Sequence, residues 1–137
     1  MIYCRRSPSL AGGRGGGDVN LYAFDIDHTL EVSGGPIPVE SMRKLAAEGH
    51  IVGLCGNWAV VTRAVPDWYR FISFVGPMAM TKADFLGQLR LHVGAVDYVM
   101  VGNSPRYSSA GLSDDEGAAA LAGWRFIQEQ AFAAGER

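Results

Sequence analysis

The chain has 137 residues, of which 48% are hydrophobic and 19% are charged, and its net charge is −2 with a pI of about 5.9. This length fits one domain with an ordinary hydrophobic core. The slight negative charge argues against broad electrostatic binding of nucleic acid, which requires a basic surface. No apolar run approaches the roughly 20 residues that cross a bilayer, and none follows Arg5 and Arg6 as it would in a signal peptide, so no membrane association is expected.

Residues 1–19 are rich in glycine and arginine and include the run GGRGGG. Because glycine loses the most entropy on ordering, we predict a flexible tail here and a single folded domain over residues 20–137. An Arg/Gly segment can touch RNA, but this short run is a weak signal. Cys4 and Cys55 lie in different settings, so no disulfide is expected and a reduced, cytoplasmic protein is the default.

The first part of the domain alternates short apolar runs with a helical pattern. Residues 21–26, LYAFDI, are predicted to form a strand that ends in carboxylates. Residues 28–38 resemble a hairpin because the turn sequence SGG separates two short apolar stretches. A helix is expected over residues 38–49, where apolar residues recur at helical spacing and a glycine marks the end. The next predicted strand covers residues 50–55.

The middle of the chain predicts two helices from their start signals. Asn57 is positioned to cap a short helix over residues 58–65. Thr81 and Asp84 form a capping-box pattern that opens a longer helix over residues 82–93.

The last part predicts one more helix and completes the set of strands. Ser113 and Glu116 form a second capping-box pattern, which opens a helix over residues 114–122. The remaining strands are predicted at residues 71–75, 97–101 and 124–127, and the final stretch covers residues 128–137.

Strands that alternate with helices predict an α/β fold with right-handed crossovers. We expect a Rossmann-like three-layer sandwich with a five-stranded, mostly parallel sheet. Sheets of this kind bind ligands beyond the carboxyl ends of their strands. The polar residues at those ends are therefore the candidates for function.

Two carboxylates, Asp25 and Asp27, close the first predicted strand within the sequence DIDHT. Two acids this close concentrate negative charge, which is costly unless a cation neutralises it. Mg²⁺ suits carboxylate oxygens and commonly binds through few protein ligands plus a phosphate. A pair of solvated acids in a turn is the alternative for any bare DxD. The hydrophobic strand before the pair and Thr29-Leu30 after it favour the functional interpretation.

A hydrophobic strand that ends in DxDxT resembles motif I of the haloacid dehalogenase superfamily. The resemblance implies that Asp25 attacks phosphorus and becomes an aspartyl phosphate. It also implies that Asp27 protonates the leaving group and then activates water. The segment 28–38 is similar to the flap that follows motif I in this family, and an ordinary loop is the alternative.

The phosphate-binding positions of the family match this chain in part. Where the family has Ser or Thr, the second strand ends in Cys55, whose thiol is a poor hydrogen-bond donor; a small core residue is the alternative. The backbone amides of Gly56 and Asn57 are expected to bind phosphate at a helix N-terminus. Lys82 matches the motif III lysine that screens phosphate and nucleophile. A cation in a first helical turn is unfavourable unless an anion lies nearby, and a solvated lysine is the alternative.

The metal-binding positions also match with changes. The fourth strand ends in Gly102-Asn103, where the family typically shows Gly-Asp, so an amide oxygen would replace a carboxylate on Mg²⁺. Asp115, at the start of a small-residue helix, resembles the acidic residue that closes motif IV, although its spacing from Asn103 is longer than usual. Acids in a first helical turn also stabilise the helix without any metal. The predicted metal ligands are therefore Asp25, Asp27, Asn103 and Asp115.

Together these positions predict a cap-less, Mg²⁺-dependent phosphatase. No cap domain fits, because the crossovers already account for the intervals from Asp25 to Cys55 and from Cys55 to Lys82. An open site implies either a large phosphorylated substrate or a neighbouring subunit that acts as a lid, as in a homo-oligomer. The sequence leaves both open.

Two other interpretations remain to be weighed. The first is an inactive or weakly active binding module of the same fold, which the departures at Cys55 and Asn103 favour and the intact Asp25 and Asp27 oppose. The second is a signalling receiver domain, which takes phosphate on an Asp at the end of strand three. Here that strand reads FISFVGP and carries no acid.

Overall fold

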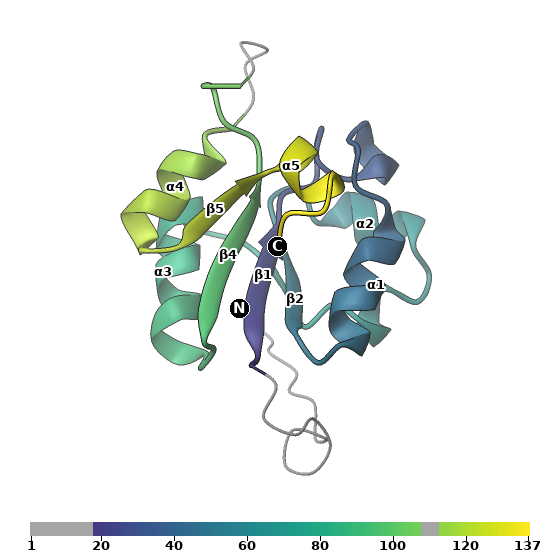
Figure 1. Ribbon diagram of the computed structural model, residues 1–137, viewed down its shortest axis with the longest axis horizontal. Helices are drawn as coiled ribbons and strands as arrows, with labels where there is room; N and C mark the ends of the chain where they lie inside the picture. The colour runs from purple at the N-terminus through teal and green to yellow at the C-terminus, as the bar shows by residue number, and fades with distance from the viewer. Residues whose placement is uncertain (1–17, 108–112) are drawn as a thin grey trace.

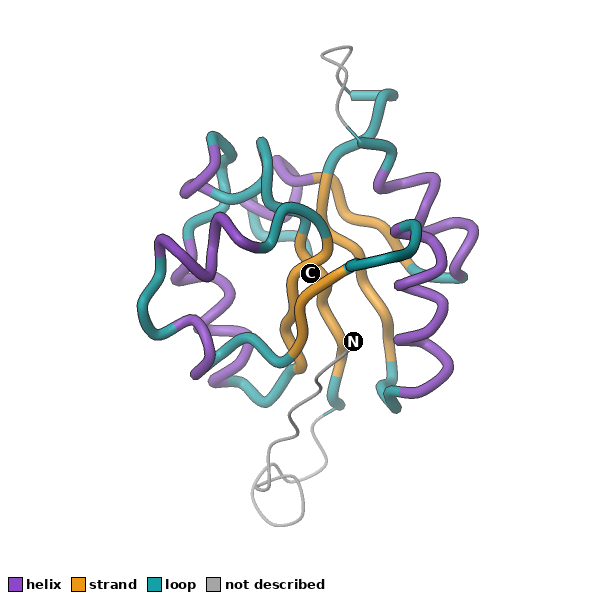
Figure 2. Tube along the Cα trace, turned by 180° about the vertical axis from the view of Figure 1, so that it is seen from behind, coloured by secondary structure: helices purple, strands orange, loops and turns teal. Residues whose placement is uncertain are grey.

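A computed structural model describes residues 18–107 and 113–137 of the chain (Figures 1 and 2). The predicted flexible tail lies outside the described residues up to residue 17. Val19, which the sequence placed in that tail, packs against the hydrophobic core. Its carbonyl also accepts a hydrogen bond from the Val96 N–H at 2.8 Å. The folded domain therefore includes Val19.

Five strands form one parallel sheet, which confirms the predicted α/β architecture. They are β1 (Asn20–Phe24), β2 (Ile51–Cys55), β3 (Phe74–Gly76), β4 (Asp97–Gly102) and β5 (Arg125–Gln128). Their order across the sheet is β3-β2-β1-β4-β5, and every neighbouring pair is parallel. The sheet is thus wholly parallel rather than mostly parallel.

Helices cover both faces of this sheet and make three layers (Figures 1 and 2). The helices are α1 (Val39–Ala47), α2 (Ala59–Ala64), α3 (Lys82–His92), α4 (Asp115–Ala122) and α5 (Glu129–Ala133), with short 3-10 turns η2 (Glu31–Ser33) and η3 (Trp68–Arg70). In Figure 1, α1 and α2 lie on one side of the sheet, and α3 and α4 lie on the other. Within the described residues, η2 and α1 occupy the connection from β1 to β2, and α2 and η3 that from β2 to β3.

Alternate residues of the central strand β1 serve the two layers. Tyr22 and Phe24 belong to the core that α1 and α2 cover, whereas Leu21 and Ala23 belong to the core under α3 and α4. Successive side chains of a strand point to opposite faces, so a strand buried on both faces is apolar throughout. This double burial fixes β1 at the centre of the sheet, so the residues that follow its carboxyl end have a fixed position.

The order of the strands places the topological switch point of the sheet between β1 and β4. The chain moves outward from β1 through β2 to β3, then returns to β4 on the other side of β1. Ligands bind at such a switch point in open parallel sheets. This order also differs from the 2-1-3-4-5 order of flavodoxin-like folds, which include receiver domains. The topology therefore argues against the receiver interpretation.

The start signals of the helices were only partly correct. Thr81 caps α3 as predicted, and its hydroxyl accepts a hydrogen bond from the Asp84 N–H at 3.1 Å. Asn57 does not cap α2; Trp58 precedes that helix without a capping side chain, and the Asn57 amide donates to Asp27.

The other cap and the hairpin also differ from expectation. Asp114 caps α4 in place of Ser113, and its carboxylate accepts a hydrogen bond from the Gly117 N–H at 2.8 Å. The 3-10 turn η2 and a single bridge between Leu30 and Ile37 replace the predicted hairpin. The third strand begins only at Phe74, because the N–H groups of Phe71 and Ile72 donate to the Trp68 carbonyl instead of pairing with β2.

No helix among the described residues is long and apolar enough to cross a membrane.

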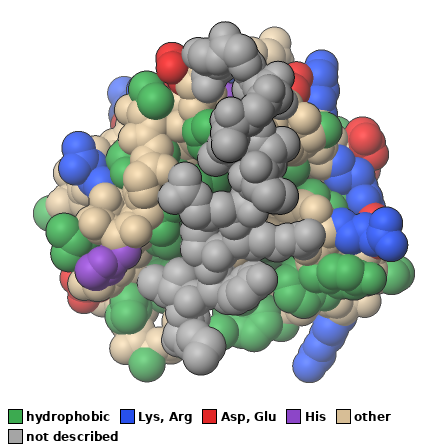
Figure 3. Space-filling view, turned by 90° about the horizontal axis from the view of Figure 1, so that it is seen from below, with side chains coloured by type: hydrophobic (Ala, Val, Ile, Leu, Met, Phe, Trp, Pro, Cys, Tyr) green, Lys and Arg blue, Asp and Glu red, His purple; other side chains and the backbone are tan. Residues whose placement is uncertain are grey.

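Figure 3 views the molecule from the end at which the strands begin, opposite their carboxyl ends. Several Lys and Arg side chains gather on the side where Figure 1 places α1 and α2.

Candidate functional site

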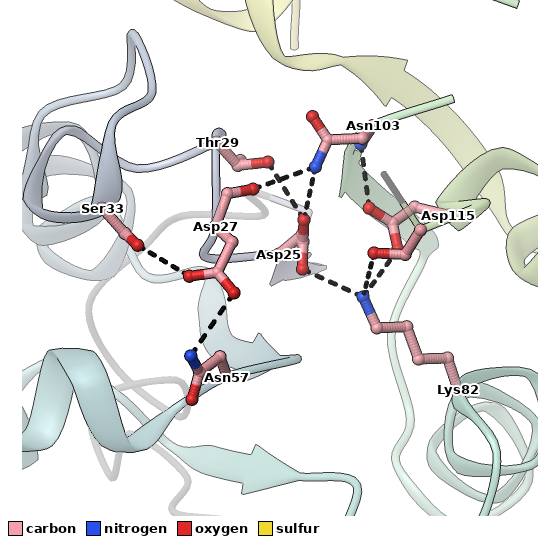
Figure 4. A network of polar contacts seen from close by, with 9 residues as sticks. Asp25, Asp27, Thr29, Ser33, Asn57, Lys82, Asn103 and Asp115 are labelled. Carbon is pink, nitrogen blue, oxygen red and sulfur yellow. Dashed lines mark hydrogen bonds and ion pairs between the residues drawn. The ribbon is translucent and has the colours of Figure 1, made fainter. Parts of the chain in front are cut away.

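The predicted site residues meet at the carboxyl ends of the strands (Figure 4). Asp25 follows β1 and Asn103 follows β4, so they lie on either side of the switch point of the sheet. Lys82 and Asp115 are the first residues of α3 and α4, which cover the same face of the sheet. The loop after β1 contributes Asp27. Four segments that are far apart in the sequence thus build one polar network.

Asp25 is the centre of this network and is only 3% exposed. Its N–H donates to the Val101 carbonyl at 2.9 Å, which extends the pairing of β1 with β4 and fixes the backbone. Oδ1 accepts from the Lys82 ammonium at 2.9 Å. Oδ2 accepts from the Asn103 amide at 2.6 Å and from the Thr29 hydroxyl at 3.3 Å. Both oxygens are therefore held, which keeps a buried carboxylate tolerable.

Asp27 differs from Asp25 because it is exposed. Its Oδ1 accepts from the Ser33 hydroxyl at 2.7 Å, and its Oδ2 accepts from the Asn57 amide at 3.3 Å. The backbone turns sharply at the next residue, His28, which has a positive φ of 60°. Non-glycine residues in this region are uncommon and cluster at functional sites. The turn directs the Asp27 carboxylate toward solvent beside the buried Asp25.

Lys82 lies between two carboxylates. Its ammonium is 2.9 Å from Asp25 Oδ1 and 2.7 Å from Asp115 Oδ1. Burial alone would lower the pKa of Lys82, but the charges of Asp25 and Asp115 outweigh it and raise the pKa above its ordinary value. The lysine is thus a cation at neutral pH. This contact supplies the anion that a lysine in a first helical turn requires.

Asp115 is fully buried, and both of its oxygens have partners. Oδ1 pairs with Lys82, and Oδ2 accepts from the Asn103 backbone N–H at 2.8 Å. Burial, followed by the charge of Asp25, raises the pKa of Asp115 to about 7 against the opposing effect of Lys82. A Cβ on Gly102 would lie 2.3 Å from Asp115 Oδ2, so glycine is required there. In this state Asp115 holds Lys82 and the loop after β4, and its role as a metal ligand stays a prediction.

Asn103 is buried and bridges the two halves of the DxD motif. Its amide nitrogen donates to Asp25 Oδ2 and, at 3.0 Å, to the main-chain oxygen of Asp27. Its own Oδ1 has no hydrogen-bond partner in the part of the chain that the structure describes. Among the described residues, no group of three or more His, Cys, Asp or Glu could hold a metal ion. A magnesium site here would therefore combine the Asp25 carboxylate with main-chain and amide oxygens, a mixed set that Mg²⁺ accepts.

The predicted phosphate-binding residues that follow β2 or end it have different surroundings. Cys55 lies in the core under α3, and burial raises the pKa of its thiol to about 12, which favours the core-residue alternative. The Gly56 N–H donates to the Gly76 carbonyl at 2.8 Å, so this amide is not free for phosphate, contrary to expectation. Asn57 is exposed beside Asp27, but α2 begins only at Ala59 and has six residues.

Gly56 nevertheless matters to the site through its missing side chain. Its φ of 153° lies in the range that favours glycine, and a Cβ there would lie 2.5 Å from Asp25 Oδ1. Only a residue without a side chain can therefore lie this close to Asp25.

Sequence reasoning missed four residues of the site. Thr29 is buried against Asp25, and the T of DIDHT was a usable signal for it. Ser33 holds Asp27, and the Ser113 hydroxyl lies 3.4 Å from the Lys82 ammonium. Glu129 follows β5 and is buried, and its Oε2 has no partner within residues 18–107 and 113–137. No local pattern marks Glu129, because only the arrangement of strands places it at this edge.

Comparison of the chain with protein-family models, curated proteins and solved structures finds no match.

Proposed function

We propose that the chain is a Mg²⁺-dependent phosphomonoester hydrolase that acts through an aspartyl phosphate, in the manner of the haloacid dehalogenase superfamily that its DIDHT motif resembles. The observation that carries the proposal is the network at the switch point of the sheet. There the buried Asp25 contacts Lys82 on one side and Asn103 on the other, with Asp27 beside them.

The geometry distinguishes the two oxygens of the proposed nucleophile. Oδ2 of Asp25 is occupied by Asn103 and Thr29. Oδ1 accepts only from the Lys82 ammonium among the described residues. Oδ1 is therefore the oxygen that attacks phosphorus, because Oδ2 is held by two donors, whereas Lys82 beside Oδ1 can offset the charge on the phosphoryl oxygens.

Asp25 is buried and Lys82 is already engaged, so the approach of a phosphoryl group requires a movement. The Lys82 ammonium lies at the end of a flexible, partly exposed side chain. It can shift from Asp25 toward the phosphoryl oxygens while Asp115 retains it. Asp115 is thus a positioning residue in this proposal, since it keeps the cation at the site when Asp25 turns to the substrate.

Asp27 serves as the general acid and base. Its carboxyl group is exposed beside the nucleophile, and Ser33 and Asn57 hold its two oxygens. In the first half-reaction a bond forms between Asp25 Oδ1 and phosphorus, the bond from phosphorus to the leaving oxygen breaks, and Asp27 gives that oxygen its proton. In the second half-reaction water attacks phosphorus, Asp27 takes a proton from it, and inorganic phosphate leaves as Asp25 is regenerated.

The residues present fit a magnesium ion. Asp25, the main-chain oxygen of Asp27, and Asn103 with its unpartnered Oδ1 would hold it, and Asp115 would act through the loop after β4. When bound, the ion supplies charge stabilisation to the phosphoryl oxygens.

A non-catalytic binding module is the second candidate. It is favoured by the Gly56 amide, which is bonded to Gly76, and by the buried thiol of Cys55, because both weaken the expected phosphate cradle.

One experiment separates the two candidates. The full chain is assayed with sugar, nucleotide and protein phosphates and with p-nitrophenyl phosphate, each with Mg²⁺ and with EDTA. Asp25→Asn is the matched control, and acid-quenched samples are searched by mass spectrometry for phosphate on Asp25. Mg²⁺-dependent turnover with a phosphorylated Asp25 is expected. Binding of phosphate compounds without turnover or phosphoaspartate would leave the binding module.

A further inference from the structure

Two buried oxygens at the site have no hydrogen-bond partner among the described residues: Asn103 Oδ1 and Glu129 Oε2. Asn103 is 2% exposed and Glu129 is 8% exposed. Leaving a buried acceptor unpaired costs about 1–3 kcal/mol, so such atoms are rare and need an explanation. In Figure 4, Oδ1 of Asn103 points away from Asp25, whereas its amide nitrogen points toward Asp25.

The two residues follow neighbouring strands at the same edge of the sheet. Gly102 and Gln128, the last residues of β4 and β5, are register partners, and Asn103 and Glu129 follow them directly, Glu129 as the first residue of α5. The two unpaired oxygens are therefore carried by adjacent strand ends.

Asn103 and Glu129 also lie on the same side of the sheet. Val101 and Ile127 are register partners, and both belong to the core under α1 and α2. Asn103 comes two residues after Val101, and Glu129 opens α5, whose Phe132 belongs to the same core, so both residues lie toward that side of the sheet.

The electrostatics connect Glu129 to the first strand. Burial is the largest cause that raises the pKa of Glu129, but the charge of Asp25 raises it further and that of His28 lowers it. The Glu129 carboxyl group thus lies within electrostatic reach of the DIDHT loop, although no sequence signal connected the two.

We propose that the side-chain amide of Asn103 turns over when a divalent cation binds. Its nitrogen then donates to Glu129 Oε2, and its Oδ1 joins Asp25 Oδ2 and the main-chain oxygen of Asp27 around the cation. This inference rests on the magnesium site of the proposed function. In the structure the amide nitrogen lies between these two oxygens, 2.6 Å from the first and 3.0 Å from the second.

Each state satisfies what the other leaves unsatisfied. Without a cation, a turned amide would bring three oxygens together with no hydrogen between them, which Coulomb repulsion opposes. With a cation, the observed orientation would set an N–H group against a positive charge. Turning the amide replaces that clash with a ligand and gives the unpaired Glu129 oxygen a donor.

Glu129 therefore acts as a positioning residue for Asn103. Its carboxylate would orient the amide and place a negative charge behind it, in partial compensation for the charge that a carboxylate at position 103 would supply. Acceptors behind a metal ligand commonly fix its orientation, and their loss costs 10–100-fold in metal affinity.

The test measures Mg²⁺ binding by calorimetry on the full chain without substrate. Glu129→Leu, which removes the acceptor, should weaken binding about tenfold. Glu129→Gln, which keeps an acceptor oxygen, should retain most of the affinity. In the Asn103→Asp background there is no amide to turn, so adding Glu129→Leu should not weaken binding. Equal weakening by Glu129→Leu in both backgrounds would overturn the proposal.

A second readout uses the unaltered chain, in case Glu129→Leu does not fold. The two side-chain N–H signals of Asn103 are identified by NMR from their loss in Asn103→Asp. Saturation with Mg²⁺ should shift them strongly, because their partners change from Asp25 and Asp27 to Glu129. Unchanged signals at saturation overturn the proposal, as does an absence of Mg²⁺ binding.

These outcomes are independent of turnover. A chain that hydrolyses phosphomonoesters with Mg²⁺ but leaves the Asn103 signals unmoved keeps its proposed function and loses this inference. A chain that shows the shift without any turnover loses the hydrolase and keeps the cation-dependent amide.

Discussion

The two sides of Asp25 are built in opposite ways. On the lysine side, formed by Asp25 Oδ1, Lys82 and Asp115, every charged group has an oppositely charged partner within 2.9 Å. On the amide side, formed by Asp25 Oδ2, Asn103 and Glu129, two buried oxygens have no hydrogen-bond partner among the described residues. The contrast teaches that the charges on one side are paired throughout, whereas the other side keeps two unpaired acceptors. The predictions below test that contrast.

Replacing the group shared by both sides has the largest expected effect. Asp25→Asn keeps the shape of the side chain but removes the anionic nucleophile and one of its two acceptor oxygens. The rate of phosphomonoester hydrolysis should fall by at least about 10³-fold. Circular dichroism should show an unchanged fold. A rate within tenfold of the parent would exclude Asp25 from the nucleophilic role.

Breaking the lysine side should destabilise the fold. Lys82→Met leaves the buried carboxylates of Asp25 and Asp115 without their cation, which should lower the free energy of unfolding by about 3–5 kcal/mol. Urea denaturation in EDTA measures this. Asp115→Asn in the Lys82→Met background serves as the matched control, because removing one of the two acids should restore part of the loss. No restoration would mean that charge is not the cause.

The pH dependence of stability sharpens the description of the lysine side. Burial and the charge of Asp25 raise the pKa of Asp115 to about 7, whereas its value in the unfolded chain is about 3.9. Between these values the folded protein holds a proton that the unfolded chain has lost, so stability should fall as pH rises from about 4 to 7.

Asp115→Asn should remove this fall, which is on the order of 1 kcal/mol per pH unit. Denaturation of both proteins in EDTA at pH 5, 6 and 7 measures the two slopes. Parallel slopes would show that Asp115 is ionised across the whole window.

The smallest effect is expected outside both sides. The Ser33 hydroxyl donates to the exposed carboxylate of Asp27 at 2.7 Å. Ser33→Ala should change the free energy of unfolding by no more than about 0.5 kcal/mol, because the hydrogen bond is exposed. Its influence should appear instead as a few-fold fall in turnover, through a less well-oriented Asp27. A loss of stability as large as that of Lys82→Met would contradict the distinction between the buried network around Asp25 and the exposed contacts of Asp27.

Local sequence signals predicted much of the site because parallel strands end at one edge. The DIDHT motif located Asp25 and Asp27, and the charge conflict of Lys82 at a helix start indicated a nearby anion. The structure places Asp25 against that lysine. The strand that ends in Gly102-Asn103 likewise indicated that Asn103 would reach the same edge. Each of these inferences used only the spacing of apolar residues within an element and the residues at its ends.

The sequence by itself determined the α/β class, the alternation of elements and the residues at the strand ends, because these depend on patterns within about ten residues. Only the tertiary structure decided which groups satisfy one another. The Gly56 N–H donates to the Gly76 carbonyl, and Asp115 pairs with Lys82. Glu129 becomes buried beside the site only because β5 lies next to β4. Such pairings depend on how elements pack in space, and no local pattern records the energy of burying one charge beside another.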